Sequence, residues 1–500
     1  MSIKRYTIGY DLGTSFVKAS MMDEQGTCVA SVSVPDREMT ISVQHPGWAE
    51  QDPEAWWSNL VDATLKLKSK VRFQNDEIKG IGITYQMHGL VLVNKEQQVI
   101  RPSIIWCDSR AVAIGNEAFE QLGEKWCLRH YLNSPGNFTA SKLKWVLDYE
   151  PNLTKQIDKV MLPGDFIAMK MTGEVNTTIG GLSEGILWDF RSNQPAYRLL
   201  EHYGASAEWL PELVPTFGEQ GYLCKKAADE LGLNVKTPIT YRAGDQPNNA
   251  FSLNVLKPGE LAATAGTSGV IYGVGDEASW DEQSRVNTFA HVNHKSGKPS
   301  YGTLLCINGT GIQNSWIRRA VSRDGKLSYE QMNAEAESVQ PGSDGLMIFP
   351  FGNGAERVFQ NQLLNASIEG LNFNLHGSGH LFRATQEGIV NALHYGMSVM
   401  KDMDIKPTVV RAGRANMFLS PVFRETFVNT TGCVLELFET DGSLGAARGA
   451  AVGAGIFASF QSAFDQLQPV DVIEPSAQKM TSNQAQYERW LELLMKKLNE

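Results

Sequence analysis

Two short stretches of this chain carry nearly the same pattern, an apolar strand-like run that breaks into a Gly-Thr-Ser turn. The first, residues 6–18, reads YTIGYDLGTSFVK, and the second, residues 261–269, reads LAATAGTSG. Thr14 and Thr267 lie about half of the 500-residue chain apart. One such device in each half predicts two similar domains, each presenting backbone N–H groups and hydroxyls to an anion such as a nucleotide phosphate.

Composition and charge narrow the class of protein. With 500 residues, of which 42% are hydrophobic and 20% charged, the chain is typical of a globular protein with two or three domains. Its net charge of −10 disfavours binding to nucleic acid or to an anionic membrane surface. The six cysteines form no CxxC pair, and we interpret them as reduced thiols of a cytoplasmic protein. We find no signal peptide and no apolar run of about 18 residues, so we expect no membrane span.

Strand-like and helical segments alternate along both halves, which indicates a mixed α/β fold. In the first half we expect strands at 6–10, 18–22, 27–34 and 78–84 and a helix at 54–67. In the second half we expect strands near Leu261, Val270 and Tyr301 and helices at 382–402, 418–428, 443–458 and 483–498. Pro/Gly punctuation at 256–259 is the preferred boundary, which gives one domain of residues 1–255 and a second of residues 256–500.

The strongest single cluster of polar residues is YRAGDQP at 241–247, which follows a short strand at 238–240. Gly244 allows a sharp turn, so Asp245 is expected at the carboxyl end of the strand, where open α/β sheets bind ligands. A carboxylate there can accept the proton of a sugar hydroxyl while that hydroxyl attacks phosphorus. The alternative is an aspartate that caps the following helix, because Asp is a preferred N-cap residue.

Asp11 lies at the turn of the first device. Its carboxylate would repel a phosphate, and a Mg²⁺ ion that keeps several waters would reconcile the two. The alternative is a turn aspartate that hydrogen-bonds its own backbone. The second Gly-Thr-Ser device favours the metal contact.

The segment Gln86-Met87-His88-Gly89 follows an apolar strand and offers both donors and acceptors to the hydroxyls of a small polyol. The alternative is that His88 is a buried and satisfied core histidine, the usual role of a lone histidine. Trp48 lies in a Pro-Gly loop and would supply a flat apolar wall to a sugar face, although most tryptophans are core residues.

The segment RAGRAN at 411–416 is a small-residue turn between an apolar strand and a helix. Such a turn allows a flat ring to approach closely, and the side chain of Asn416 would bond its edge; a simple strand-to-helix turn is the alternative. The sequence has no G-x-x-x-x-G-K-[ST], no protein-kinase HRD and DFG set, no H-E-x-x-H and no zinc-spaced Cys/His set. These absences exclude the Walker-type nucleotide binders and the protein kinases.

Several segments together resemble the FGGY carbohydrate kinases, members of the actin-like ATPase superfamily. They are IGYDLGTSFVK, HPGWAEQDPEAWW, GITYQMHGLVLV, RPSIIWCDSR, LPGDFIAMKMTGE, AGDQPNNA, ATAGTSG, EGIVNALHYGM and GSLGAARGAAVGAG. The resemblance runs from Gly9 to about Gly455 and is greatest to the xylulokinases of that family. It implies two ribonuclease-H-like domains with an active-site cleft between them, sugar and catalytic base on the first and nucleotide on the second.

The resemblance also implies roles for particular residues. Asp245 corresponds to the catalytic base, and Asp11 to the acidic residue of the first phosphate loop, which is linked to Mg²⁺ and counted among the catalytic residues. Met87 and His88 correspond to the sugar-contacting pair, and Gln246 neighbours the base. The nucleotide contacts correspond to Thr14 and Ser15 in the first turn, Gly266, Thr267 and Ser268 in the second, and Gly311, Gln313, Gly413 and Asn416. Arg411-Ala412 stands where relatives usually have Gly-Gly, which leaves the nucleotide preference open.

We therefore expect an enzyme that transfers the γ-phosphoryl group of ATP, with Mg²⁺, to the terminal hydroxyl of a ketopentose. The expected ketopentose is D-xylulose. Another ketopentose, a pentitol or glycerol is the alternative within the class. Outside the sugar and polyol kinases, one alternative is a sugar-responsive regulator without turnover. Another is an actin-like filament protein or a chaperone-type ATPase. Dimerisation is common among such kinases, so a homodimer is a further expectation.

Overall fold

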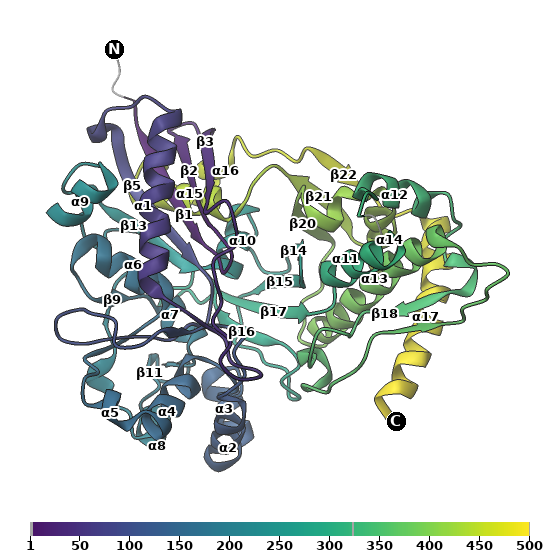
Figure 1. Ribbon diagram of the computed structural model, residues 1–500, viewed down its shortest axis with the longest axis horizontal. Coiled ribbons are helices and arrows are strands. Elements are labelled where there is room, and N and C mark those ends of the chain that lie inside the picture. Colours follow the sequence, from purple (N-terminus) through teal and green to yellow (C-terminus); the bar gives the residue numbers. More distant parts are fainter. Residues whose placement is uncertain (1–3, 323–324, 500) are drawn as a thin grey trace. The chain divides into compact units, whose positions relative to one another are not determined.

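The computed structural model describes residues 4–322 and 325–499, which divide into two compact units, each built around its own sheet (Figure 1). Unit 1 consists of Met1–Asn254, Phe289–Tyr301 and Thr440–Gln468, and unit 2 of Val255–Thr288, Gly302–Glu439 and Pro469–Glu500. Each unit is assembled from several separate stretches of chain. The predicted two-domain α/β fold is confirmed.

A five-stranded sheet forms the centre of unit 1, in the order β13-β5-β1-β2-β3. Its strands are β1 (Tyr6–Leu12), β2 (Val17–Asp23), β3 (Cys28–Val34), β5 (Ile78–Tyr85) and β13 (Ile239–Gly244). β1 pairs antiparallel with β2 and parallel with β5, and β5 pairs parallel with β13. The carboxyl ends of β1, β5 and β13 therefore meet at one edge of the sheet.

Helices cover both faces of this sheet. Side chains alternate along β1, so Tyr10 bonds Thr64 of α1 (Pro53–Lys70), whereas Thr7 bonds the carbonyl of Ala447 in α15 (Gly442–Gly453). α15 approaches the strands closely because glycines face it: a Cβ on Gly82 would overlap the backbone of α15 at Ala446. The close contact explains why the apolar, glycine-rich sequence after residue 441 forms a packed helix.

The remaining elements of unit 1 surround these layers (Figure 1). The helices are α2 (Val112–Leu122), α3 (Glu124–Tyr131), α4 (Thr139–Tyr149), α5 (Pro151–Thr154), α6 (Pro163–Thr172), α7 (Ile179–Glu184), α8 (Tyr197–Tyr203), α9 (Lys225–Leu231), α10 (Asp245–Ser252) and α16 (Phe460–Phe464). The short strand pairs are β4 (Glu50–Gln51) with β7 (Ser103–Ile104), β6 (Val91–Val93) with β8 (Lys159–Met161), β9 (Asn176–Thr177) with β12 (Glu212–Leu213), and β10 (Trp188–Asp189) with β11 (Gln194–Pro195).

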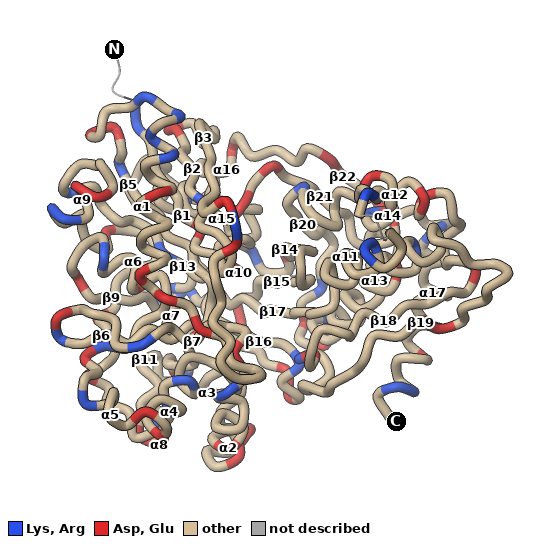
Figure 2. Tube along the Cα trace, viewed as in Figure 1, with Lys and Arg blue, Asp and Glu red and all other residues tan. Residues whose placement is uncertain are grey.

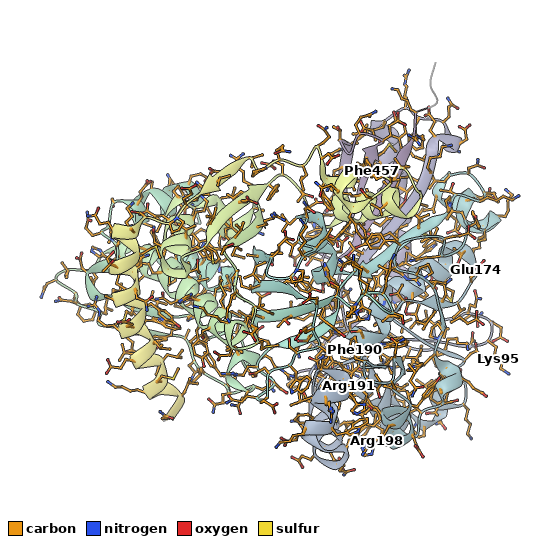
Figure 3. All side chains as sticks on the ribbon, turned by 180° about the vertical axis from the view of Figure 1, so that it is seen from behind. Lys95, Glu174, Phe190, Arg191, Arg198 and Phe457 are labelled. Carbon is orange, nitrogen blue, oxygen red and sulfur yellow. The ribbon has the colours of Figure 1, made fainter. Side chains whose placement is uncertain are left out.

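Aromatic contacts hold the segment 289–301 within unit 1. The ring of Phe190, labelled in Figure 3, lies 5.8 Å from the ring of His294 and 5.5 Å from the ring of Tyr301, measured between centroids. Both contacts are edge-to-face, the favourable geometry for aromatic pairs.

A seven-stranded sheet, mainly in unit 2, repeats the arrangement of the first sheet. Its order is β16-β17-β15-β14-β20-β21-β22, with β14 (Leu261–Ala265), β15 (Gly269–Gly275), β16 (Asn287–Ala290), β17 (Tyr301–Ile307), β20 (Val409–Gly413), β21 (Val434–Phe438) and β22 (Asp471–Ile473). β14 pairs antiparallel with β15 and parallel with β20, as β1 does with β2 and β5. Each Gly-Thr-Ser segment thus joins two antiparallel strands beside a parallel third, as the sequence repeat predicts.

Five α-helices and a strand pair complete unit 2 in the part of the chain that the structure describes. They are α11 (Gly311–Val321), α12 (Tyr329–Glu337), α13 (Ser378–Asp402), α14 (Pro421–Thr431), α17 (Ala477–Asn499), and β18 (Met347–Phe349) with β19 (Ser367–Glu369). The core of the unit includes Ile389 and Leu393 of α13 and Trp490 of α17, all nearly or fully buried.

Three local predictions are wrong in detail. Asp11 lies within β1, where it pairs with Lys18, and not in the turn. The helix predicted at 443–458 ends at Gly453. The helix predicted from 418 starts at Pro421, because Ser420 caps it and Pro at the first helical position favours that start.

Surface chemistry agrees with the composition. Figure 2 shows basic and acidic residues interspersed along both units rather than gathered by sign. No helix of the described chain is long and apolar enough to cross a lipid bilayer. All six cysteines, each in a described segment, are free thiols.

Candidate active site

The predicted residues of the first half gather at the carboxyl edge of the unit 1 sheet. In the register of the sheet, Leu12 of β1 and Gly244 of β13 both lie opposite Tyr85 of β5. The segments that follow these three strands, with Thr14, Met87 and Asp245, therefore start side by side. This is the edge at which open α/β sheets bind ligands.

Asp245 is the first residue of α10, and Gly244 occupies the N-cap position. The N-cap alternative for Asp245 therefore does not hold. Burial, and then the nearby charge of Asp11, raises the pKa of Asp245 to about 7, although hydrogen bonds from Gln246 oppose the shift. A carboxyl with a pKa near neutrality can both accept and release a proton.

Asp11 is half-buried near the end of β1, among other acids. Burial, and then the charge of Asp441, raises the pKa of Asp11 to about 6, while Lys18 opposes the shift. Asp441 caps α15 by accepting bonds from Ser443 and Leu444. Asp11 has no counterpart in the second device, where Thr264 stands at the equivalent place.

His88 has a fixed tautomer. Its Nδ1 lies 2.9 Å from the carbonyl oxygen of Glu184, which can only accept, so Nδ1 carries the proton and Nε2 is the acceptor. Burial, and then the charge of Lys142, lowers the pKa of His88 to about 3, so the ring is neutral. The backbone of His88 has φ 62°, a strained left-handed conformation for a residue with a side chain. Strain of this kind is often found at functional sites.

Met87 lies beside the turn at Gly244, which precedes Asp245. Together with Glu184, Arg242 and Gly244 it lines a cavity of about 10 Å³, room for a single water molecule. Glu184 is a residue that the sequence did not single out as functional. Burial, and then the charge of Asp245, raises the pKa of the Glu184 carboxyl well above its usual value, which places a second perturbed acid beside Asp245.

The first Gly-Thr-Ser turn is hydrogen-bonded to the segment with Met87 and His88. The hydroxyl of Thr14 donates to Gln86 Oε1 at 3.2 Å and accepts from Trp106 Nε1 at 2.9 Å. Gln51 Nε2 donates to the carbonyl of Thr14 at 2.8 Å and Gln86 Nε2 to Gln51 Oε1 at 3.0 Å. The carbonyl of Ser15 accepts from Met39, so this residue fixes the turn through its backbone.

Trp48 packs as a partly buried side chain. The guanidinium of Arg110 lies 3.8 Å from the centroid of its ring, and the ring of Trp145 lies 5.1 Å away. Among the described residues, its ring contacts are these two and His45. The side chain also packs against the buried cluster that contains Leu90 and Ile104, and its contact with the sugar stays a prediction.

In unit 2, four of the predicted nucleotide residues line one cavity of about 540 Å³: Gly266, Thr267, Gly311 and Asn416. The cavity lies where the parallel strands β14 and β20 end and α11 begins. The N–H of Gly311 donates to the carbonyl of Gly266 at 2.9 Å, an approach that a side chain at 311 would block. Small-molecule sites are typically cavities of 300–1,000 Å³, so the size fits a nucleotide.

The other predicted nucleotide residues do not line this cavity. Gln313 lines a neighbouring cavity of about 430 Å³ on the other side of Ile312. Ser268 interacts with the thiol of Cys306, and Gly413 is the last residue of β20. Asn314, one residue beyond Gln313, does line the nucleotide-sized cavity, and its Oδ1 has no partner there. An acceptor left unpaired at a cavity wall is what a ligand donor would satisfy.

Two further residues shape this cavity region in ways that the sequence did not reveal. Arg411 bonds Glu436 at 2.9 Å and does not line the cavity, so its charge is engaged elsewhere. The carboxylate of Glu356 accepts the N–H of Asn308 with both oxygens at 3.0 Å. It thereby holds the turn that leads into Gly311.

The residues present fit a magnesium ion at Asp11. Within residues 4–322 and 325–499, no group of three or more His, Cys, Asp and Glu side chains forms a metal cage. Mg²⁺ usually binds one or two carboxylates, several waters and substrate phosphates, so a cage is not required. Asp11 repels Asp245 and is itself repelled by Asp441, and a divalent cation at Asp11 would offset this repulsion.

Comparison of this chain with models of protein families shows to which family it belongs. The family model described as "FGGY family of carbohydrate kinases, N-terminal domain" matches residues 6–252, and the corresponding C-terminal domain matches residues 261–457. The chain belongs to the FGGY family of carbohydrate kinases. It is therefore a phosphotransferase with an alcohol group as acceptor, and its substrate is a small carbohydrate.

Individual relatives agree with the FGGY assignment. The chain is 30% identical over 497 residues to a xylulose kinase of Escherichia coli K12, which covers 97% of this chain and 98% of the relative. It is 28% identical over 484 residues to a xylulose kinase of Bacillus subtilis 168, with coverage of 95% and 94%. A crystal structure of xylulose kinase from Rhodospirillum rubrum superposes with a TM-score of 0.85 at 26% identity, covering 98% of this chain and 99% of that one.

Proposed function

We propose that this carbohydrate kinase transfers the γ-phosphoryl group of ATP to the terminal hydroxyl of D-xylulose, giving D-xylulose 5-phosphate. The observation that carries the proposal is the meeting of Asp245, Asp11 and the Met87–His88 segment at one sheet edge. The likeness to proteins named xylulose kinase supports the choice of sugar.

In this proposal Asp245 is the general base. Its carboxylate accepts the proton of the sugar hydroxyl as that oxygen attacks the γ-phosphorus and the bond to the ADP oxygen breaks. Gln246 orients the carboxylate, and His88 Nε2 accepts a hydrogen bond from a second hydroxyl of the sugar. Phosphoryl transfer has a loose transition state, so positioning and charge stabilisation supply most of the rate.

The nucleotide is assigned to unit 2. Gly266, Thr267 and Gly311 would hold its phosphates through backbone N–H groups, and Asn314 and Asn416 would bond its base and ribose. Thr14 and Ser15 supply the equivalent groups in unit 1. A magnesium ion at Asp11 supplies charge that offsets the phosphates when it is bound.

The substitution Asp245→Asn tests the assignment of the base. It preserves the shape of the side chain and removes its basicity, so we expect a lowered kcat by about 10²–10⁴ with an unchanged thermal unfolding midpoint. Turnover close to that of the wild type would show that Asp245 is not the base.

A substrate panel tests the sugar. We would measure ADP release with D-xylulose, D-ribulose, xylitol and glycerol, each over a range of concentrations. The proposal requires the highest kcat/KM with D-xylulose. A preference for glycerol or a pentitol would retain the kinase and replace the acceptor, and ADP release with none of them would reject catalysis of this class.

A further inference from the structure

Lys142 is a fully buried lysine on α4 whose two hydrogen bonds are both to main-chain carbonyls. Its Nζ lies 2.9 Å from the carbonyl oxygen of His88 and 3.0 Å from that of Ile105. Burying an ammonium is costly unless it is paired, and burial lowers the pKa of Lys142 to about 7, with the charge of Asp108 opposing. Burying this amine costs free energy of folding, which indicates a role of Lys142 in its two contacts.

Both carbonyls belong to loops that reach the candidate active site. His88 lies in the segment assigned to the sugar, and its left-handed backbone holds the carbonyl in a strained position. Ile105 precedes Trp106, whose indole N–H bonds the hydroxyl of Thr14 in the first Gly-Thr-Ser turn. One ammonium therefore joins the sugar segment to the loop that touches the phosphate turn.

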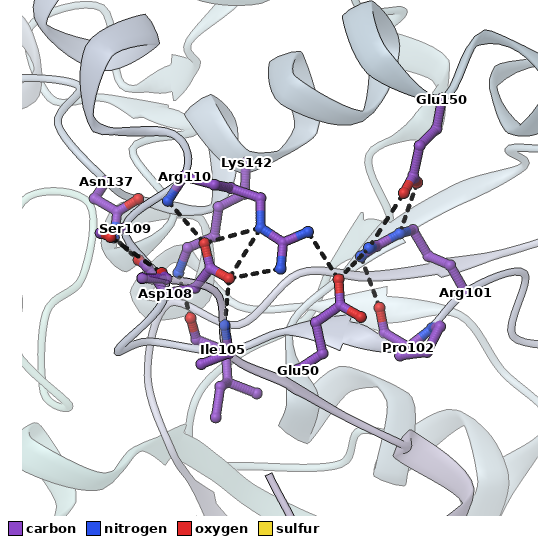
Figure 4. A network of polar contacts seen from close by, with 12 residues as sticks. Glu50, Arg101, Pro102, Ile105, Asp108, Ser109, Arg110, Asn137, Lys142 and Glu150 are labelled. Atoms are coloured by element: carbon purple, nitrogen blue, oxygen red, sulfur yellow. Dashed lines mark hydrogen bonds and ion pairs between the residues drawn. The ribbon is translucent and has the colours of Figure 1, made fainter. Parts of the chain in front are cut away.

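The rest of the second loop is held by a dense polar network, drawn in Figure 4. Asp108 accepts the N–H of Ala49 at 2.6 Å and pairs with Arg110 through both oxygens. Arg110 also pairs with Glu50 at 2.8 Å, and Asn137 donates to the carbonyl of Asp108. The loop is thus fixed beyond residue 108. Before that point the N–H of Leu90 donates to the carbonyl of Ile104 at 3.0 Å, and Lys142 adds a side-chain link between the carbonyls of His88 and Ile105.

We infer that Lys142 is a positioning residue of the sugar site, which fixes His88 and Trp106 relative to each other by holding the carbonyls of His88 and Ile105. The inference rests on the proposed function, because it takes the His88 segment as the sugar-binding segment. Lys142 itself touches no reacting atom. Its effect is expected to be larger on the sugar than on the nucleotide, since Lys142 bonds His88 directly but reaches the phosphate turn only through Trp106, and the nucleotide-sized cavity is lined by unit 2 residues.

The test compares Lys142→Met with Lys144→Met. Methionine has a similar volume and no donor, and Asp108 keeps its pairing with Arg110, so no charge is stranded. Lys144 lies on the same helix and pairs with Asp148 at the surface, so it is a matched control. We expect Lys142→Met to raise the KM for the sugar by at least about tenfold, with the KM for ATP changed less than about twofold. Lys144→Met should change neither.

Hydrogen–deuterium exchange tests the same inference without turnover. In Lys142→Met we expect exchange about tenfold faster in the two segments that Lys142 joins, at Leu90 and at Asp108, with unchanged exchange in unit 2. Lys142→Gln, which keeps a donor, should give an intermediate effect in both measurements and replaces the methionine variant if that one does not fold.

The outcomes separate the two proposals. Equal rises in both KM values, or exchange that quickens throughout unit 1, would reduce Lys142 to a general stabilising residue and overturn the inference. Unchanged sugar KM and unchanged exchange would overturn it as well. If the wild type phosphorylates no sugar of the panel while the exchange result holds, the proposed function fails and the link between the two loops stands.

Discussion

At the scale of single residues, the candidate site is marked by side chains whose pKa values differ from those of the same side chains in water. Burial raises the pKa of Asp245, Asp11 and Glu184, a neighbouring acid adds to each of these shifts, and His88 is a neutral imidazole. Such shifts cluster at functional sites because burial and neighbouring charges are arranged there together. The sequence indicated Asp245, Asp11 and His88 through their motifs. It did not indicate Glu184 or Lys142, because nothing in a helix sequence shows which polar side chain is buried.

The raised pKa of Asp245 predicts a pH dependence of the rate. A general base must be ionised, so kcat/KM for the sugar should rise with pH through about 7 and then level off. Asp11→Asn removes one of the two causes of the shift, so the rising limb of its residual activity should move to lower pH. Initial rates between pH 5.5 and 9 measure both profiles. A rate that is flat across this range would contradict the assignment of the base.

The lowered pKa of His88 predicts a pH dependence of stability. As pH falls below 6.5, the unfolded chain binds a proton at this imidazole, whereas the folded chain does not until about pH 3. The folded state therefore loses up to about 2 kcal/mol between pH 7.5 and pH 5 through this residue. His88→Asn lacks the effect and tolerates the left-handed backbone.

Urea unfolding at the two pH values measures the difference between wild type and His88→Asn. The wild type should lose more stability than the variant on acidification. Equal losses would mean that His88 is protonated in the folded protein.

At the scale of elements, the repeated strand-turn device was the strongest predictor of the fold. An apolar run with a Gly-Thr-Ser break was enough to place β1 and β14 and the antiparallel strands that follow them. Element ends were less predictable. The apolar run after residue 443 continues past the end of α15 at Gly453, because Gly455 adopts a left-handed backbone with φ 69° and the N–H of Ile456 turns back to the carbonyl of Ala451.

The close contact between α15 and the sheet predicts a large effect of a small substitution. A methyl group at Gly82 would overlap the backbone of Ala446, so Gly82→Ala should destabilise the protein by about 3 kcal/mol or more. Gly180→Ala in α7 is the control: the nearest atom to its added carbon lies 3.6 Å away, an ordinary contact. Thermal unfolding of both variants is the measurement, and equal midpoints would contradict the packing.

At the scale of the whole molecule, the nucleotide residues show the limit of prediction from motifs. Gly266, Thr267, Gly311 and Asn416 were placed together by resemblance and line one cavity. Gln313 was named with them but lines the neighbouring cavity, whereas Asn314 lines this one; the contact of either with the nucleotide stays a prediction. Which of two adjacent helix residues faces a cavity depends on the rotation of α11, and a change of one residue turns a side chain by about 100°.

Assigning the sugar to unit 1 and the nucleotide to unit 2 predicts separate protection by the two ligands. ADP with Mg²⁺ should slow amide exchange at 265–267, 311–315 and 416–420, and D-xylulose should slow it at 86–90. Mass spectrometry of peptides from the full chain measures both. Protection of 311–315 by the sugar alone would contradict the division of roles.

The return of the chain to unit 1 after residue 440 has a consequence for how the protein is made. On the ribosome, the first 254 residues emerge long before α15, so the face of the first sheet that carries Gly9 and Gly82 has no cover for nearly two hundred further residues. A nascent chain in that condition exposes apolar surface and cannot complete its first core. Unit 1 therefore completes its core only near the end of translation, and a gene truncated after residue 255 should yield aggregated material rather than a working sugar-binding half.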